Sequence, residues 1–256
     1  MSYNFDQLNA NTEFKIEERV FIGKGVTFGP NCKKIEIGYG SFIGNDTYID
    51  VPELKIGEYT TIHNHATIHG YEKCSIGNNC WIGQFCIIDS IAGTTIGNNV
   101  GIGAHSQLWT HIKFGDMLEG CNWNSTKPLI IEDDVWFVGH SIVSPITAKA
   151  KSMLMVGGLI TKDMEENHIY AGSPAKDVTE KLGNQFSSVS LEEKRNRFEK
   201  LYKDFLQVNG LKEVEFEIEI VSEMKNYSMD MFNGSKPIYF LKERMYLPTR
   251  SELEFN

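Results

Sequence analysis

A six-residue phrase recurs through most of this chain and constrains its fold more than any other feature. The first position of the phrase is aliphatic and the second is usually glycine, as in the segments that begin at Ile37, Ile56, Ile76 and Ile96. The fifth position is small, at Val26, Cys32, Ser41, Thr47, Thr60, Ala66, Cys80, Cys86, Val100, Ser106, Val135 and Ser141. A period of six fits neither a helix nor an alternating strand, whereas hexapeptide repeats are a known signature of a parallel β-helix.

The physics of a β-helix explains each position of the phrase. Three short strands make one coil of a triangular prism, and the aliphatic residues stack from coil to coil as an apolar column. The small fifth residue fits where the prism narrows, and the glycine is expected where the turn takes a backbone conformation that is costly for other residues. We therefore predict a mainly β chain, with an N-terminal extension over residues 1–19 and the β-helix over residues 20–182.

The repeat stops after Ile102 and resumes in step at Ile131. The gap exceeds one coil, so we expect the chain to leave the prism between His111 and Lys127 as a protruding loop. This loop carries Phe114 and Trp123 among polar residues, which is too aromatic for a plain disordered segment. We expect this loop to pack against another protein surface, and the simplest candidate is a neighbouring subunit.

Composition excludes several classes of function. The formal net charge is −9 and the pI is about 5.3, so bulk electrostatics do not favour a nucleic-acid partner. No apolar run approaches the roughly 20 residues that span a bilayer, and the polar N-terminus does not resemble a secretory signal. The five cysteines lack paired spacing, which fits a reducing compartment. The expected location is cytoplasmic.

The repeats, the loop and three later stretches together resemble the hexapeptide acyltransferases. The stretches are VWFVGHSIVSP (residues 135–145), LITKDM (159–164) and IYAGSPAK (169–176). The subgroup that this chain is most similar to acetylates sugars, xenobiotics and surface polysaccharides. The resemblance covers about residues 20–182 and implies a left-handed parallel β-helix. It also implies a homotrimer that binds acetyl-coenzyme A between adjacent subunits as acyl donor, with no metal.

The resemblance places His111, in the sequence Trp-Thr-His, where the family's catalytic histidine opens the loop. Acyl transfer needs a base near the acceptor, and an imidazole titrates near neutrality. We expect His111 to deprotonate a hydroxyl, or less readily an amine, of a sugar, nucleotide sugar or glycan precursor. The residues assigned to the acceptor are Trp109, Phe114, Trp123 and His140, although His140 could instead line the cofactor groove. A backbone N–H in residues 137–140 is the family-like oxyanion donor, but the expected glycine is displaced by one position, to Gly139.

An acidic protein that binds coenzyme A needs local cations and backbone donors. Lysines accumulate after His140, and glycines there would let the pantetheine arm lie close to the backbone. The residues assigned to the cofactor are Trp136, Gly139, Gly157, Gly158, Lys162, Ser173, Pro174 and Lys176. Alternatively, the lysines only protect edge strands from aggregation.

Residues 183–256 are expected to form a small α+β appendage that has no counterpart in the family. Ser190 and Glu193 form a capping box, and a helical stripe follows at Leu191, Phe198, Leu201, Tyr202 and Phe205. The alternating residues 213–220 predict a strand, and KPIYFL and RMYL predict two more beyond the turn signal at Asn233–Gly234. The appendage could shape the acceptor site or brace the trimer.

Two other functions remain open from the sequence. His69, His105 and His111 resemble the zinc ligands of the β-helical γ-class carbonic anhydrases, which would make the chain a lyase. The family pair is spaced one residue closer than His105 and His111, however, and the long loop is less typical there. The remaining alternative is a trimeric scaffold that has lost catalysis.

Overall fold

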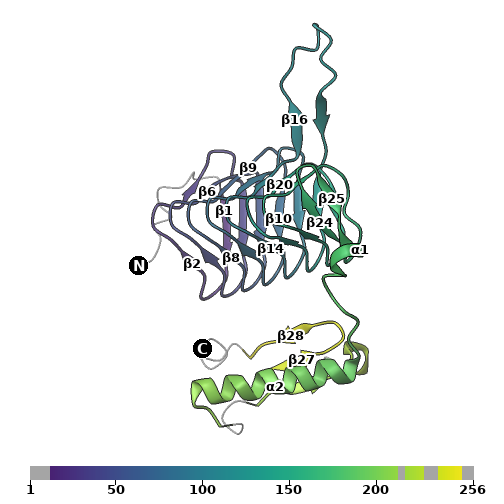
Figure 1. The fold of residues 1–256 in the computed structure, drawn as a ribbon. Helices are drawn as coiled ribbons and strands as arrows, with labels where there is room; N and C mark the ends of the chain where they lie inside the picture. The colour runs from purple at the N-terminus through teal and green to yellow at the C-terminus, as the bar shows by residue number, and fades with distance from the viewer. Residues whose placement is uncertain (1–11, 213–216, 228–235, 250–256) are drawn as a thin grey trace. The chain divides into compact units, whose positions relative to one another are not determined.

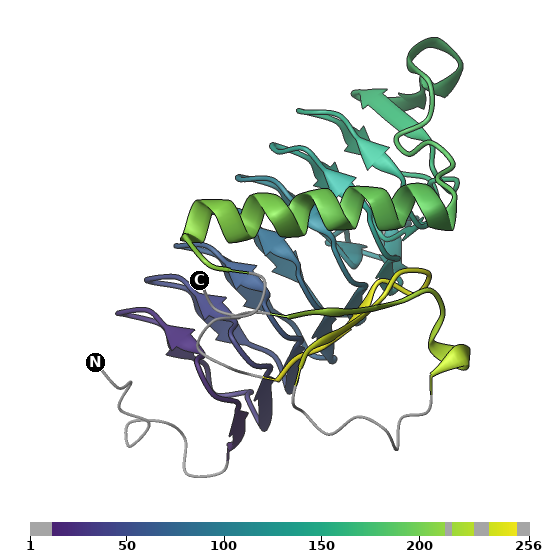
Figure 2. The same ribbon diagram turned by 90° about the horizontal axis from the view of Figure 1, so that it is seen from below.

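The protein, seen here in a computed structural model, is described over residues 12–212, 217–227 and 236–249. It divides into two compact units, and the boundary in the sequence lies between Phe186 and Ser187. The first unit is a left-handed parallel β-helix, whose short strands stack coil upon coil as a prism with three flat faces (Figures 1 and 2). The fold predicted from the hexads is therefore confirmed.

Each face of the prism is one sheet of parallel strands, and successive strands of the prism visit the three sheets in turn. The exception is the last pair, β24 and β25, which is antiparallel and lies within one sheet. The first sheet contains β1 (Glu13–Ile16), β4 (Lys34–Ile37), β7 (Glu53–Ile56), β10 (Cys74–Ile76), β13 (Thr94–Ile96), β18 (Leu129–Ile131) and β21 (Thr147–Ala148). The second contains β2 (Phe21–Ile22), β5 (Phe42–Ile43), β8 (Thr61–Ile62), β11 (Trp81–Ile82), β14 (Gly101–Ile102), β19 (Trp136–Phe137), β22 (Met153–Leu154), β24 (Ile169–Gly172) and β25 (Ala175–Asp177). The third contains β3 (Thr27–Phe28), β6 (Tyr48–Asp50), β9 (Thr67–His69), β12 (Ile87–Asp89), β15 (Gln107–Leu108), β20 (Ile142–Val143) and β23 (Leu159–Ile160). Strand β1 pairs in parallel with β4, so the prism already includes residues of the segment expected to be an N-terminal extension, of which residues 1–11 lie outside the described residues.

The core is a set of aliphatic columns that run along the prism. Ile62, Ile82 and Ile102 are register partners in the second sheet and are fully buried. Every small residue predicted at the fifth position of the phrase is also buried. The hydroxyls among them donate to turn carbonyls, as Ser41 Oγ does to Gly57 O at 2.7 Å and Thr60 Oγ1 does to Gly77 O at 2.7 Å. A small polar side chain therefore fills the corner of the prism and satisfies a turn carbonyl, either of the next coil or, as Ser106 does with Gly103 O, of its own coil.

The reason proposed for glycine at the second position is wrong. Gly38, Gly44 and their equivalents are absent from the residues with positive φ. A Cβ on Gly38 would instead lie 2.6 Å from the backbone carbon of Gly57, and one on Gly44 would lie 2.5 Å from the nitrogen of Asn64. Glycine is needed there because the coils approach so closely. The left-handed conformation falls two positions later, at non-glycine residues such as Asp46 (φ +55°) and Asn99 (φ +56°).

The excursion expected between His111 and Lys127 is a two-stranded antiparallel ribbon, here called the arm. Strand β16 (His111–Lys113) pairs with β17 (Asn124–Thr126), and the ribbon projects away from the prism (Figure 1). Strand β13 pairs directly with β18 across the interruption, so the stack of coils continues in register. The side chains of Phe114 and Leu118 are 101% and 96% exposed in the single chain.

The second unit contains α2 (Leu191–Asn209) and the three-stranded sheet β26 (Glu219–Val221), β27 (Ile238–Phe240) and β28 (Met245–Leu247), with a 3₁₀ turn at Met224–Asn226; the short helix α1 (Thr179–Leu182) belongs to the first unit. The capping box predicted at Ser190 is confirmed at the start of α2. The ring of Phe198 stacks on Tyr239 at 4.5 Å, so the helix packs on the sheet. Leu191 and Leu201 were expected in the buried stripe, but they are 36% and 67% exposed, whereas Phe198, Tyr202 and Phe205 are half-buried. Residues 213–216 of the predicted strand and the Asn233–Gly234 turn lie outside the described residues.

We expect Ile82→Ala to lower the free energy of unfolding by about 3 kcal/mol, because it removes a fully buried side chain from a close-packed column. The matched control is Lys55→Ala on an exposed position of β7, which should change stability by less than about 0.5 kcal/mol. Chemical denaturation followed by circular dichroism measures both. Equal effects of the two substitutions would contradict the assignment of the column.

Candidate active site

His111 begins β16, at the root of the arm, and its ring faces a buried carboxylate. Its Nδ1 lies 2.8 Å from Oδ2 of Asp89, at the end of β12. The side chain of Asp89 is 0% exposed, whereas that of His111 is 27% exposed. Sequence reasoning missed Asp89, which lies 22 residues before His111 and carries no motif of its own. The third sheet brings it there, because β12 and β15 are neighbouring strands and His111 follows β15.

Hydrogen bonds from Thr110, from the backbone N–H of Ile91 and from the histidine favour the ionised form of Asp89. Its Oδ2 accepts hydrogen bonds from Thr110 N–H at 2.8 Å and from Thr110 Oγ1 at 2.6 Å. Burial alone would raise the pKa of Asp89, but the hydrogen bonds from Thr110 and His111 outweigh it and lower that pKa below the ordinary value. An ionised carboxylate can only accept, so Nδ1 of His111 is the donor to Asp89. In the neutral imidazole this tautomer leaves the lone pair on Nε2, where a proton can be taken up.

An aromatic ring contacts His111, and a hollow that His111 itself does not line lies beside the loop that follows Asp89. The ring of Trp109 lies edge-on to His111, with centroids 6.0 Å apart. A hollow of about 660 Å³ opens beside the loop that follows Asp89 and is lined by Ile91, Ala92, Thr126 and Pro128 among others. Ala92 N–H donates to Thr110 Oγ1 at 3.1 Å, which ties this loop to the same hydrogen-bond network.

Of the other residues predicted for the acceptor, Phe114 and Trp123 lie on the arm and His140 does not. Trp123 is 73% exposed, and among the described residues no hydrogen bond, ion pair or ring contact joins it or Phe114 to His111. His140 is exposed at the edge between the second and third sheets, and its ring stacks on His105 at 4.9 Å. Within one chain, therefore, only Trp109 of this predicted set contacts the His111 ring.

The residues predicted for the cofactor are spread over the later coils. The outward Trp136 of β19 is 45% exposed, Gly139 and Gly157 have positive φ, and Gly158 packs against Leu154. Ser173 and Pro174 form the turn between β24 and β25, and the exposed Lys176 lies on β25. Lys162 is exposed just after β23. In the stretch proposed for the oxyanion, Val138 N–H already donates to Leu154 O at 3.0 Å and His140 N–H to Ala104 O at 2.9 Å.

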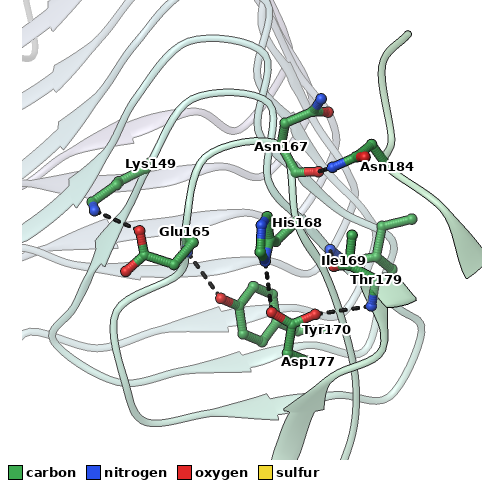
Figure 3. Close-up of polar contacts among 9 residues, drawn as sticks. All are labelled: Lys149, Glu165, Asn167, His168, Ile169, Tyr170, Asp177, Thr179 and Asn184. Carbon is green, nitrogen blue, oxygen red and sulfur yellow. Dashed lines mark hydrogen bonds and ion pairs between the residues drawn. The ribbon is translucent and has the colours of Figure 1, made fainter. Parts of the chain in front are cut away.

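A second imidazole–carboxylate pair, His168 and Asp177, lies at the last coil of the prism. Nδ1 of His168 lies 2.6 Å from Oδ2 of Asp177, whose Oδ1 accepts from Thr179 N–H at 2.8 Å (Figure 3). Hydrogen bonds from Thr179 and His168 lower the pKa of Asp177 to about 2. Both partners are accessible, at 38% and 41% exposure, beside a cavity of about 550 Å³ that Glu180 and Asn184 also line. The pair ties β25 back to the preceding coil, while Asn184 Nδ2 donates to Asn167 O at 3.0 Å.

The three histidines of the zinc alternative do not gather at one place. His69 is the register partner of Asp89, and His111 contacts the same carboxylate. The ring of His105 is instead stacked between Phe85 and His140 at another edge of the prism. Within residues 12–212, 217–227 and 236–249, no group of three His, Cys, Asp or Glu side chains could hold a metal ion. The same ranges contain no helix with the length and apolarity that crossing a membrane requires.

We expect Thr110→Val to raise the pKa of Asp89 toward its ordinary value, because the nearly isosteric side chain removes the Oγ1 donor. The substitution should also lower the free energy of unfolding by about 1–3 kcal/mol near neutral pH. A lowered carboxylate pKa stabilises the fold above the unfolded value of about 3.9, so the deficit should shrink as the pH falls below about 4. Carboxyl NMR titration and denaturation at several pH values measure these effects. Thr95→Val, at an exposed position, is the control, and an unchanged Asp89 titration in Thr110→Val would refute the account.

Comparison with known proteins gives relatives in one class of enzyme. A chloramphenicol acetyltransferase of Agrobacterium fabrum is 26% identical over 165 residues, which span 58% of this chain and 78% of that protein. A putative acetyltransferase of Schizosaccharomyces pombe is 35% identical over 97 residues, which span 36% of this chain and 46% of that protein. No protein-family model matches the chain.

Solved structures include the polysialic acid O-acetyltransferase OatWY, with 18% sequence identity, a TM-score of 0.46 and coverage of 66% of this chain and 84% of that one. A hexapeptide-repeat acetyltransferase of Vibrio cholerae, complexed with acetyl-coenzyme A, has 17% identity and a TM-score of 0.36. The match covers 60% of this chain and 70% of that one. The prism and the curated relatives together confirm that this chain resembles the hexapeptide-repeat acyltransferases.

Proposed function

We propose that this protein transfers an acetyl group from acetyl-coenzyme A to a hydroxyl, or less readily an amine, of a sugar, nucleotide sugar or glycan precursor. The observation that carries the proposal is the His111–Asp89 pair at the root of the arm, 2.8 Å apart, with the carboxylate fully buried. Acyl transfer requires a positioned base, and the pair supplies one. The acetyltransferase relatives support the reaction class.

In this mechanism the acceptor hydroxyl lies against Nε2 of His111. As the hydroxyl oxygen attacks the thioester carbonyl, Nε2 takes its proton and the imidazole becomes positively charged. Asp89, which holds Nδ1–H, stabilises that charge, and the three donors to its Oδ2 keep it ionised and oriented. When the tetrahedral intermediate collapses, the C–S bond breaks and the imidazolium returns the proton to the departing thiolate. The products are the acetylated acceptor and free coenzyme A.

We further propose that the protein works as a homotrimer with its active sites between subunits. The arm supports this assembly, since Phe114 and Leu118 are almost completely exposed in the single chain and such side chains favour burial. Among the described residues of one chain, no hydrogen bond, ion pair or ring contact joins His111 to the stretch 137–140 or to the predicted cofactor residues. A second copy could bring its own stretch to His111, which would complete the site. Measuring the molar mass of the protein in solution tests whether it is a trimer.

The reaction is tested by a screen of nucleotide sugars and oligosaccharides for acceptor-dependent release of the coenzyme A thiol. We expect His111→Ala to lower kcat by about a hundredfold or more while leaving the Kd for coenzyme A largely unchanged, because only the base is removed. Steady-state kinetics and calorimetry measure the two quantities. Turnover that survives His111→Ala would remove this residue from the catalytic role.

Asp89→Asn should lower kcat by on the order of a hundredfold with an unchanged Kd for coenzyme A. Its amide can donate to Nδ1, which would move the proton to Nε2 and abolish the base. The ¹⁵N shifts of the His111 ring report this tautomer change directly. Asp177→Asn, which breaks the other His–Asp pair, is the control and should leave both tautomer and turnover unchanged. A tautomer shift without loss of kcat would contradict the positioning role of Asp89.

A further inference from the structure

Four rings form a continuous stack along the edge between the second and third sheets. The centroids of His65 and Phe85 are 4.8 Å apart, those of Phe85 and His105 are 5.0 Å apart, and those of His105 and His140 are 4.9 Å apart. The planes deviate by only 11° to 12°, so the rings lie face to face. Each of the four residues is exposed and has a positive φ, between 49° and 60°. We call this row the ring ladder.

The register of the coils identifies the next position of the ladder. His105 N–H donates to Gln84 O at 3.0 Å and His140 N–H donates to Ala104 O at 2.9 Å, each across to the preceding coil. Gly157 repeats this bond, because its N–H donates to Gly139 O at 2.9 Å, and its φ is +69°. Gly157 therefore occupies the rung after His140 but has no ring to place there.

The rung at Gly157 is open. Apart from Gly157 itself and its two chain neighbours, no described atom lies within 4 Å of the point where a Cβ on Gly157 would stand. Among the described residues, the only ring stacked on His140 is that of His105, so the opposite face of the imidazole has no ring partner. The backbone does not require glycine here, since His140 (φ +49°) and Phe85 (φ +58°) carry side chains in the same conformation. The chain thus leaves space for one further planar ring, which we call the open rung.

We propose that the open rung binds the heterocyclic base of a nucleotide, stacked on His140. This inference rests on the proposed function, whose donor carries adenine and whose acceptor class includes nucleotide sugars. A flat heterocycle stacks on an imidazole as the ladder's own rings do, and base stacking on aromatic side chains is tolerant of base identity. The exposed Lys162 and Lys176 lie in the segments that follow this rung and supply positive charge for the phosphates. The base comes either from the acyl donor or from a nucleotide-sugar acceptor.

The decisive variant is Gly157→His, which supplies the missing ring from the protein itself. The left-handed backbone accepts histidine at two neighbouring rungs, so we expect an unchanged or higher Tm. The same ring occupies the open rung, so the Kd for the nucleotide should rise about tenfold or more. His140→Ala removes the platform and should weaken binding in the same way. His65→Ala, at the other end of the ladder, is the matched control and should leave the Kd unchanged.

Isothermal titration with four probes separates the sources of the base. The probes are coenzyme A, 4′-phosphopantetheine, which lacks the base, and the nucleotides UDP and dTDP. Weaker binding of coenzyme A but not of 4′-phosphopantetheine by Gly157→His assigns the rung to the donor's adenine. Weaker binding of UDP or dTDP, with coenzyme A unaffected, assigns it to the acceptor's base. Both outcomes support the proposal.

Three outcomes would overturn it: unchanged binding of every probe by Gly157→His, equal weakening of coenzyme A and 4′-phosphopantetheine, or no binding of any base-containing probe by the wild-type protein. The first two leave the proposed function standing if the wild-type protein still releases coenzyme A thiol in the presence of an acceptor. The third, together with absent turnover, would overturn the proposed function as well. A change in oligomeric size on Gly157→His without a change in any Kd would assign the rung to a ring of a second copy.

Discussion

The close approach of successive coils is the constraint on which the rest of this structure depends. Parallel strands repeat at about 4.8 Å, and at the second hexad position the turns come so near that a Cβ on Gly38 would lie 2.6 Å from the backbone of Gly57. The aliphatic columns can close without voids only at this spacing. Outward side chains at equivalent positions of neighbouring coils are therefore separated by the same spacing. The His111–Asp89 pair and the ring ladder are both products of it, because each joins residues from neighbouring coils.

Burial separates the two His–Asp pairs more clearly than distance does. Their contacts are 2.8 Å and 2.6 Å, but Asp89 is fully buried and Asp177 is 41% exposed. Removing a carboxylate from water makes it dependent on its donors, which is why Thr110 and His111 are locked to Asp89. An exposed carboxylate exchanges its partners with water and orients an imidazole less strictly. The same pair of residue types is thus buried and held by several donors at one site, where we propose that it positions a base, and is exposed at the other, where it links β25 to the residue before β24.

The fold was predictable because each position of the hexad has its own environment, which the residue type reveals. Ile62 at the first position points inward, and Ala66 at the fifth fills the buried corner. The left-handed turn conformation was assigned to the wrong position of the hexad, because a sequence shows residue types but not the distance between coils. Asp89 was out of reach for a related reason: only strand register brings it to His111. The ring ladder was hidden by the arm, which separates His105 from His140 in the sequence although they are adjacent in space. The role of each predicted site residue, His111 included, stays a prediction.

The arm enters and leaves at one edge of the prism, while β13 pairs with β18 as though nothing had been inserted between them. Folding of the scaffold and the shape of the ribbon are therefore decoupled. An insertion at such a seam lengthens a surface loop, whose closure entropy grows only slowly with length. Evolution or an engineer could exchange this ribbon for one of another length or composition without repacking a single coil. If the arm binds the acceptor, as expected for Phe114 and Trp123, acceptor choice would then become a property that can be grafted while the scaffold stays unchanged.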